Sequence, residues 1–403
     1  MIRPQLEVAD VIRSQGDAFL AQFGATLLPE QRRVLNDLAR CRTAALGGHV
    51  EECDQCGHQQ IAYNSCRNRH CPKCQATAAA QWVEDQAADL LPVEYFHVVF
   101  TLPAVLNPIA LKYPRVVYGL LFRAAAQTLQ QVAADPKHLG AELGFLAVLH
   151  TWGQGLQFHP HVHCVVPGGG LSPDGTRWVA CRPGFFLPVR VLSRVFRGKF
   201  LAGLRAAVAR GQLSGDDPGG TPADPGSFSR LLAAAAQTEW VVYAKPPFGG
   251  PEQVLKYLAR YTHRVAISKS RLVELRDGVI HFRVKDYAQG GRPRKIALEA
   301  SEFLRRFLQH VLPTGFVRIR HYGFLAHRCR QARVALCRDL LGRAAGTADV
   351  PPSDPPERGP GITPVRDAAV CPVCGVGRLV VIAELPPLPS RRELMASPVF
   401  DTS

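Results

Sequence analysis

The sequence predicts an α+β fold in which helices flank antiparallel strands, with a small Cys-rich module near the N-terminus. Long helical stretches alternate with short stretches of β-branched and aromatic residues, such as residues 95–101. Two further strands, at about 143–152 and 159–166, are joined by Gly-Gln-Gly at 153–155 and are expected to form a hairpin. A dense block of Cys and His residues, from 53 to 74, defines the small module.

The remaining elements follow from periodicity and from helix-ending residues. Pro29 opens a helix that Gly47-Gly48 ends, and Pro92 ends an Ala-rich helix. Residues 271–298 alternate as antiparallel strands with Asp277-Gly278 as a turn. Other strands are expected at 240–243 and about 315–320. Helices are expected over about 29–45, 76–91, 113–134, 189–210, 251–261, 300–311 and 325–345.

Two segments rich in Gly, Pro and Asp interrupt these elements. Residues 214–226 are expected to form an exposed loop, and the Pro-rich stretch at 348–364 a linker. We therefore expect three parts: a helical, zinc-binding module at 1–92, a catalytic domain at 93–346, and a linker with a small tail at 347–403.

Composition points to a polyanionic partner in a reducing compartment. The chain of 403 residues has 48 Lys and Arg against 33 Asp and Glu, a net charge of +15, which fits nucleic acid as well as simple solubility. No apolar leader opens the sequence, and no apolar run of about 18 residues marks a membrane span. We therefore expect a cytoplasmic protein without a membrane partner, in which the 12 cysteines act as metal ligands rather than disulfides.

The cysteine spacing predicts a structural zinc ion. Cys53-x2-Cys56 and Cys71-x2-Cys74 lie 14 residues apart, and two such pairs can supply the four thiolates of a tetrahedral site. Side chains between the pairs could replace one of these ligands or bind a second ion: His58, Cys66 and His70. A third pair, Cys371-x2-Cys374, stands alone in the tail, with Cys329 and Cys337 as possible partners.

A second metal site is predicted at the hairpin. His161 and His163 alternate with Val162 on a strand and therefore share one face. Two imidazoles on one face can hold a divalent ion that polarises a phosphodiester and neutralises developing charge. We expect His150 on the neighbouring strand to be the third ligand, with His159 and Gln154 as the alternatives.

A pair of tyrosines supplies a possible nucleophile. Tyr257 and Tyr261, spaced four apart, lie on one face of the expected helix. An isolated pair of this kind is more often part of a core, but basic residues surround this one: Lys256, Arg260, His263, Arg264 and Lys269. Near a metal and a phosphate, a phenol can attack phosphorus and form a phosphotyrosine ester.

Several motifs, in their order and spacing, resemble the insertion sequence 91 family of rolling-circle transposases, which are two-tyrosine HUH enzymes. The resemblance runs from about residue 8 to residue 345. Its motifs are CRTAALGGH at 41–49, YNSCRNRHCPKCQ at 63–75, FHVVFTLP at 96–103, HPHVH at 159–163, VPGGG at 166–170, YLARY at 257–261 and RIRHYG at 318–323.

This resemblance implies an HUH palm, an antiparallel sheet flanked by helices, with His161 and His163 as ligands of Mg²⁺ or Mn²⁺. It also implies that Tyr257 and Tyr261 are the nucleophiles. The enzyme would nick single-stranded DNA at transposon ends and target, hold the 5′ end covalently and leave a free 3′-OH. It would work in the bacterial cytoplasm, on the nucleoid when bound to DNA.

A basic stretch near the end of the expected catalytic domain is interpreted as a track for the DNA backbone. It contains one acidic residue, Asp339, and we expect Arg320 and Tyr322 to approach the active site. The arginines are Arg318, Arg320, Arg328, Arg330, Arg333, Arg338 and Arg343.

Two other functions remain open at this point. One is an HUH endonuclease that initiates plasmid replication or acts as a relaxase. The other is a zinc-dependent DNA-binding protein without catalysis.

Overall fold

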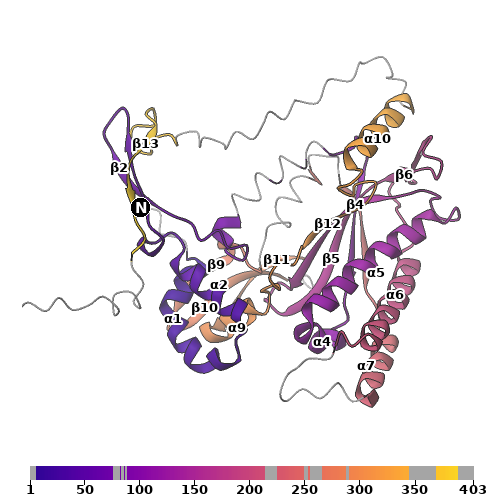
Figure 1. Cartoon of the computed structure of the whole chain (residues 1–403), viewed down its shortest axis with the longest axis horizontal. Coiled ribbons are helices and arrows are strands. Elements are labelled where there is room, and N and C mark those ends of the chain that lie inside the picture. Colours follow the sequence, from indigo (N-terminus) through magenta and orange to yellow (C-terminus); the bar gives the residue numbers. More distant parts are fainter. Residues whose placement is uncertain are drawn as a thin grey trace, which may run out of the picture.

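The structure is a computed structural model. It describes residues 6–75, 82, 86, 89–213, 225–248, 253–254, 266–286, 290–344 and 369–388. It has the mixed α/β composition expected, with antiparallel sheets (Figure 1). The helices are α1 (Val8–Phe23), α2 (Pro29–Arg40), α4 (Asn107–Lys112), α5 (Pro114–Ala134), α6 (Val189–Ala209), α7 (Pro225–Gln237), α9 (Ala300–Leu308) and α10 (Arg330–Ala344). The strands are β1 (Gly48–Cys53), β2 (Gln59–Tyr63), β3 (Tyr95–Thr101), β4 (Gly144–Trp152), β5 (Phe158–Pro167), β6 (Gly169–Leu171), β7 (Trp178–Ala180), β8 (Val242–Phe248), β9 (Leu272–Arg276), β10 (Val279–Asp286), β11 (Arg292–Glu299), β12 (Ile319–Gly323) and β13 (Leu379–Leu385).

A five-stranded antiparallel sheet forms the centre of the larger part of the molecule. Its strand order is β12-β4-β5-β3-β8. Helices α5 and α6 lie along one face, where alternate apolar residues of each strand pack against them (Figure 1). Val98 and Phe100 of β3, for example, share this core with Phe122 of α5 and Phe196 of α6. Because side chains alternate along a strand, the residues in between point to the opposite face.

The expected helices at 76–91 and 251–261 fall largely outside the described residues; most of the other expected elements are present, and several boundaries differ. The hairpin of β4 and β5 is confirmed. Strand β12 begins at Ile319 rather than near 315, because Pro313 to Phe316 form a turn closed by a backbone hydrogen bond of 3.0 Å. Helix α10 begins at Arg330 rather than 325, and α2 ends at Arg40 rather than near 45.

A second core joins the N-terminal helices to a later part of the chain. Val11 of α1 and Leu38 of α2 pack in one cluster with Phe282 of β10 and Phe303 of α9. Strands β9, β10 and β11 form the small antiparallel sheet in this unit. The cluster therefore crosses the boundary that the sequence suggested at residue 92.

A three-stranded sheet, β13-β1-β2, brings both ends of the chain together. The antiparallel pairing of β1 with β13 runs from Gly48 opposite Leu385 to Cys53 opposite Leu379. Figure 1 shows yellow β13 beside the indigo strands, away from the five-stranded sheet. The C-terminal tail, for which no strand was predicted, thus contributes a strand to the same sheet as the N-terminal hairpin. None of the described helices combines the length and apolar character that a membrane span needs.

Candidate active site and metal centres

Three histidines gather on the face of the central sheet that α5 and α6 leave free. Val162 and Cys164 of β5 pack into the helix-covered core, so His161 and His163 point the other way. The register of the hairpin places His150 of β4 directly opposite His161. The sequence prediction that these three residues share one face agrees with this geometry.

The three imidazoles are close enough to share one ion. One ligand nitrogen from each of His150, His161 and His163 lies within 4.8 Å of the other two. A single point therefore exists within about 2.8 Å of all three nitrogens, near the metal–nitrogen bond lengths of about 2.0–2.2 Å. Small side-chain rotations would complete the coordination, so the residues fit a divalent ion.

Hydrogen bonds orient two of these rings. Nδ1 of His161 lies 2.6 Å from the backbone oxygen of His159, to which it donates a hydrogen bond. Nδ1 of His163 lies 2.7 Å from Nε2 of His97. In both rings Nε2 is then the atom available for a metal. Burial lowers the pKa of His161 to about 4, so this imidazole is neutral at pH 7 and can offer a lone pair.

The alternative third ligands lie elsewhere. His159 is exposed and outside the group of three, although its ring centroid is 5.2 Å from that of His161. Gln154 accepts a hydrogen bond of 3.4 Å from the backbone of Lys285 through Oε1. The structure thus favours His150, which is buried and stacks on Trp152 at a centroid distance of 4.4 Å.

His97 is a functional candidate that the sequence interpretation missed. It lies on β3, is buried, and stacks on His163 with ring planes 9° apart. The sequence shows His97 inside a strand motif, but its contact with His163 depends on the β3–β5 register. A residue that fixes the tautomer and orientation of a ligand typically changes metal affinity or activity about 10–100-fold when removed.

Replacing His97 with alanine is therefore expected to lower strand cleavage about 10–100-fold at limiting Mn²⁺, with partial recovery at high Mn²⁺. The measurement is a metal titration of single-turnover cleavage. His97→Gln, which keeps a polar group, should cleave at a rate between those of the unaltered protein and His97→Ala. Replacement of the exposed His138 with alanine is the control. A metal dependence unchanged in His97→Ala would contradict this positioning role.

The predicted nucleophiles Tyr257 and Tyr261, with Arg260 and Arg264, lie outside the described residues. The described residue that most closely precedes them in the sequence, Val254, shows which face of the sheet this part of the chain contacts. Val254 is fully buried in a cluster with Leu146, Val148 and Val165. In β4 and β5 these three residues alternate with the helix-facing positions, so they share the histidine face.

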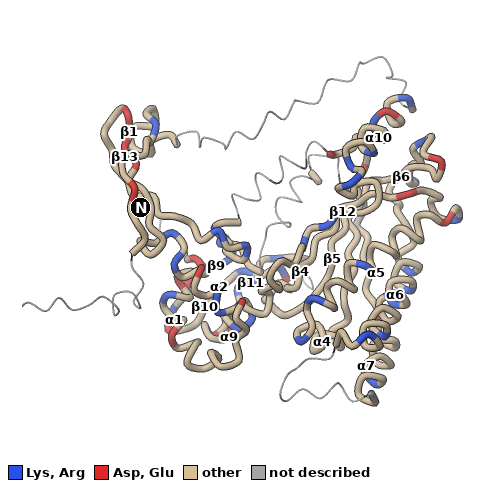
Figure 2. The backbone as a smooth tube through the Cα atoms, viewed as in Figure 1, with Lys and Arg blue, Asp and Glu red and all other residues tan. Residues whose placement is uncertain are grey.

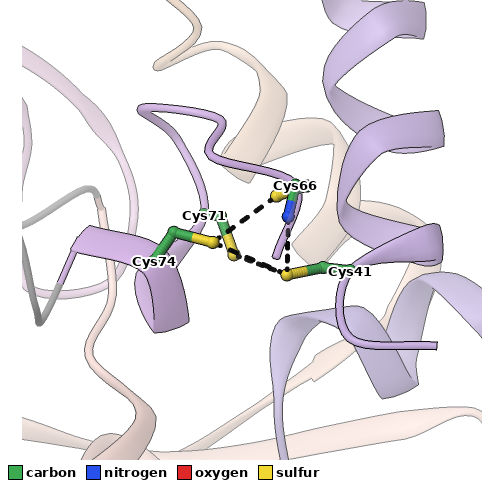
Figure 3. Close-up of side chains that lie close together, drawn as sticks. All are labelled: Cys41, Cys66, Cys71 and Cys74. Carbon is green, nitrogen blue, oxygen red and sulfur yellow. Dashed lines mark hydrogen bonds between the residues drawn. The ribbon is translucent and has the colours of Figure 1, made fainter. Parts of the chain in front are cut away.

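The four cysteines predicted to bind one zinc ion do not lie together, so this prediction was wrong. Cys71 and Cys74 join Cys41 and Cys66 in one cluster (Figure 3). Cys53 and Cys56 belong to another cluster. The reason is the topology of the β1–β2 hairpin. Cys53 and Cys56 lie at its turn, whereas Cys41 and Cys66 lie beside its open end, where β1 begins and β2 ends.

The first cluster has the dimensions of a tetrahedral thiolate site. Sγ of Cys74 lies 3.6 Å from that of Cys41 and 3.7 Å from that of Cys66, and Sγ of Cys71 lies 3.7 Å from that of Cys41. Sulfurs bound to one zinc ion at about 2.3 Å lie about 3.8 Å apart. Hydrogen bonds, first from Cys66 and then from Cys71, lower the pKa of the Cys41 thiol and favour the thiolate.

The histidines considered as zinc ligands have other positions. His70 is buried, its Nδ1 lies 3.1 Å from Oδ1 of Asn68, and its Nε2 accepts a hydrogen bond of 3.1 Å from the backbone of Leu312. Both ring nitrogens are thus engaged, and the bond to Nε2 joins the zinc-site loop to the chain after α9. His58 is outside both four-cysteine clusters.

The second cluster joins Cys53 and Cys56 to Cys371 and Cys374. The proposed partners of the tail pair were therefore wrong. Cys337 packs in an apolar cluster with residues such as Phe324, and Sγ of Cys329 contacts the backbone oxygen of Gly323 at 3.8 Å.

Strand alternation also corrects the placement of Arg320 and Tyr322. Both project to the helix-covered side of the sheet: Arg320 stacks over Phe122 at 4.2 Å, and Tyr322 stacks on Phe145 at a centroid distance of 5.2 Å. They therefore point away from the histidines. Arg318 hydrogen-bonds Gln75 at 3.3 Å, and burial lowers its pKa to about 10.

The other residues of the predicted DNA track are largely engaged with acidic groups. Arg330 pairs with Asp89 at 3.2 Å, and Arg343 pairs with Asp339 at 2.8 Å. Arg328 of this track is exposed. Outside the track, the exposed Lys269 lies 3.6 Å from a Glu7 oxygen. As a whole, the predicted track is less available to phosphates than the sequence suggested.

Comparisons with known proteins bear on both parts of the chain. Residues 11–102 match the family described as "Transposase zinc-binding domain", and residues 144–333 match the one described as "Putative transposase". The chain is 56% identical over 384 residues to "Putative transposase y4qJ" of Sinorhizobium fredii (strain NBRC 101917 / NGR234), covering 95% of this chain and 96% of that protein. It is 31% identical over 298 residues to "Transposase for insertion sequence element IS801" of Pseudomonas savastanoi pv. phaseolicola, covering 72% and 68%. No solved structure matches.

The histidine-bearing sheet, the thiolate clusters and these matched regions define a transposase with a zinc-binding domain. The chain belongs to the insertion sequence 91 family of transposases. It therefore acts on DNA, and cysteine clusters in its zinc-binding domain support a structural zinc ion.

Proposed function

We propose that this transposase nicks and joins single-stranded DNA during rolling-circle transposition through a 5′-phosphotyrosine intermediate. The observation that carries the proposal is the convergence of His150, His161 and His163 on one face of an antiparallel sheet. The five-stranded sheet with helices along its other face supports an HUH palm.

In the proposed reaction, a bound Mg²⁺ or Mn²⁺ ion would polarise the phosphodiester and offset its developing charge. The phenol oxygen of Tyr257 or Tyr261 attacks phosphorus, and the bond from phosphorus to the 3′ oxygen breaks. That oxygen leaves as a 3′-OH, and the 5′ phosphate stays on the tyrosine. Attack on this ester by another 3′-OH then joins the strands and frees the phenol.

The burial of Val254 supports the choice of these tyrosines. Val254 packs on the histidine face and precedes Tyr257 by three residues in the sequence. Three residues of chain reach no further than about 11 Å. The proposal is therefore consistent with the short length of chain between Val254 and the first proposed nucleophile.

Covalent capture tests the proposal. Single-stranded oligonucleotides from the ends of the element are labelled at the 3′ end, because the protein would keep the fragment with the new 5′ end. With Mn²⁺, a labelled band that survives denaturant should appear at the size of protein plus fragment. Binding without such a band, for every end sequence tried, would favour the non-catalytic DNA-binding alternative.

The Tyr257→Phe, Tyr261→Phe double variant is expected to lose this band completely, because no phenol remains to form the ester. Tyr63→Phe, which removes an exposed phenol on β2, is the control and should retain the band. A covalent band of unchanged intensity in the double variant would exclude both residues as the nucleophile.

A mobility assay separates transposition from plasmid replication. A marker flanked by the ends of the element should move to a second replicon only when the protein is supplied. Capture together with protein-dependent replication of the donor, and without movement of the marker, would favour the replication-initiator alternative.

A further inference from the structure

We propose that Cys53, Cys56, Cys371 and Cys374 hold a second zinc ion, which fastens the C-terminal segment to the N-terminal hairpin. The four sulfurs lie within 4.8 Å of one another. The distances from Cys53 to Cys374 and from Cys56 to Cys371 are both 3.7 Å, close to the roughly 3.8 Å expected for two thiolates on one zinc ion.

The two halves of this site have the same local structure. Each is a Cys-x2-Cys-Gly turn in which Gly57 or Gly375 has a positive φ, 69° and 68°. The glycine N–H of each turn donates to the backbone oxygen of the first cysteine, at 3.1 and 3.0 Å. Such turns present both thiolates on one side, which is the arrangement that a zinc ion requires.

Backbone N–H groups are also directed at the sulfurs. Cys53 Sγ accepts from the N–H of Gln55 at 3.4 Å, and Cys371 Sγ accepts from that of Val373 at 3.4 Å. Gly377 donates to Cys374 Sγ at 3.3 Å, and a Cβ on Gly377 would lie 2.4 Å from Cys53 Sγ. The tail backbone thus approaches the thiolates so closely that position 377 has no room for a side chain.

This site lies only half within the matched zinc-binding domain, which ends at residue 102. Its other half comes from more than 300 residues later, through β13 and its pairing with β1. An ion here would close the chain between Cys53 and Cys371. Such a small sheet, with Val380, Val381 and Ile382 exposed, buries little apolar surface and needs this additional fastening.

The charge of the ribbon argues for a structural role rather than a DNA contact. Residues 48–63 and 369–388 contain four carboxylates, Glu51, Glu52, Asp54 and Glu384, against one basic side chain, Arg378. A zinc ion with four thiolates adds a formal charge of about −2. This acidic ribbon would repel phosphates, although the whole chain carries +15.

Zinc analysis of the purified full-length chain tests the site. We expect about two zinc ions per chain, and about one in the Cys371→Ser, Cys374→Ser double variant, with DNA affinity unchanged. In that variant, proteases should remove the C-terminal segment faster. Cys181→Ser with Cys329→Ser, outside both clusters, should keep two zinc ions. One zinc ion in the unaltered chain, or two in the tail variant, would overturn the proposal.

A second variant avoids removing a thiol. Gly377→Ala should weaken zinc binding at the second site only, because the added methyl group would displace Cys53 Sγ. Cobalt substitution shows this directly, since thiolate–Co²⁺ absorption should fall from two sites to one. Two full cobalt sites of equal affinity in Gly377→Ala would contradict the proposed geometry.

A separate observation supports a second inference, which rests on the proposed action on DNA. We infer that the outer surface of α6 binds the backbone of a DNA duplex distinct from the strand being cut. Residues 175–213 contain no Asp or Glu (Figure 2). Four exposed arginines follow one side of α6 over about 22 Å. They are Arg190, Arg194, Arg197 and Arg205.

The position of α6 determines which DNA it can bind. Leu192, Phe196 and Phe200 pack into the core on the face of the sheet opposite His161 and His163. A duplex on the outer surface of α6 is therefore separated from the histidines by the sheet. A transposase that joins an element to a new site has to hold target DNA as well as the element end, and this surface fits the target.

Salt dependence tests this surface. Replacing the four α6 arginines with alanine should reduce the magnitude of the slope of log affinity against log salt by about 3.6 for a duplex without element ends. Covalent capture of a single-stranded end should remain. A control variant changes four arginines that are paired with acids: Arg13, Arg276, Arg305 and Arg343. An unchanged slope in the α6 variant would refute the surface, whereas failed capture in the unaltered chain would refute the proposed function instead.

Discussion

Replacing His163 with alanine is expected to lower strand cleavage about 10³-fold or more, because the proposed ion would lose one of three protein ligands. His163 is central to the cluster, with ring centroids 4.3 Å from His150 and 4.7 Å from His161. Single-turnover cleavage and Mn²⁺ binding should both fall. Binding of single-stranded DNA should change little, since it depends mainly on contacts to phosphates.

The neighbouring histidine provides a matched control. His159 lies on the same strand and on the same side, but it is exposed and outside the group of three. His159→Ala keeps the backbone oxygen that orients His161, so cleavage should remain within about threefold of the unaltered enzyme. Equal losses in His159→Ala and His163→Ala would mean that general damage to the strand, rather than metal binding, explains the effect.

The histidine site was predictable because its members are close in sequence. Strand alternation places His161 and His163 on one face, and a short hairpin brings His150 opposite them. The contribution of His97 could not be read in the same way. Its contact with His163 depends on which strand lies beside β5 and in which register, and neither is encoded in local periodicity.

The zinc ligands show where local spacing misleads. Two Cys-x2-Cys pairs separated by 14 residues suggested one site, but each pair completes its ligand set with cysteines from another part of the chain. Cys41 is a single cysteine after α2, and Cys371 follows Cys53 by more than 300 residues. Only the long-range pairing of β1 with β13 reveals the second set.

The basic residues show a related difficulty. Charge counts over 313–343 suggested a phosphate track, but the count does not show that Arg330 and Arg343 have acidic partners or that Arg320 stacks on Phe122. The basic character of α6 can be seen in the sequence, since residues 189–209 contain Lys and Arg but no Asp or Glu. What the sequence could not show is that its arginines lie on the face opposite the histidines.

Replacing Cys41 with serine is expected to have the largest effect on stability. The thiol is buried at the end of α2, in the core that α1 and α2 share with α9. A structural zinc ion contributes on the order of 10 kcal/mol, which is comparable to the whole stability of a domain, about 5–15 kcal/mol. Loss of one of four thiolates should therefore release about one zinc ion and unfold the core around α1, α2 and α9.

Thermal unfolding and zinc content, measured together, check this expectation and separate the two cysteine clusters. Cys41→Ser should lose one zinc ion and show an early unfolding transition. The Cys371→Ser, Cys374→Ser variant should lose one zinc ion without that transition, because its cluster lies apart from the large cores. Cys181→Ser should change neither quantity. If Cys41→Ser kept full zinc content and a normal transition, Cys41 would not be a ligand, and the first site would consist of Cys66, Cys71 and Cys74 with another partner.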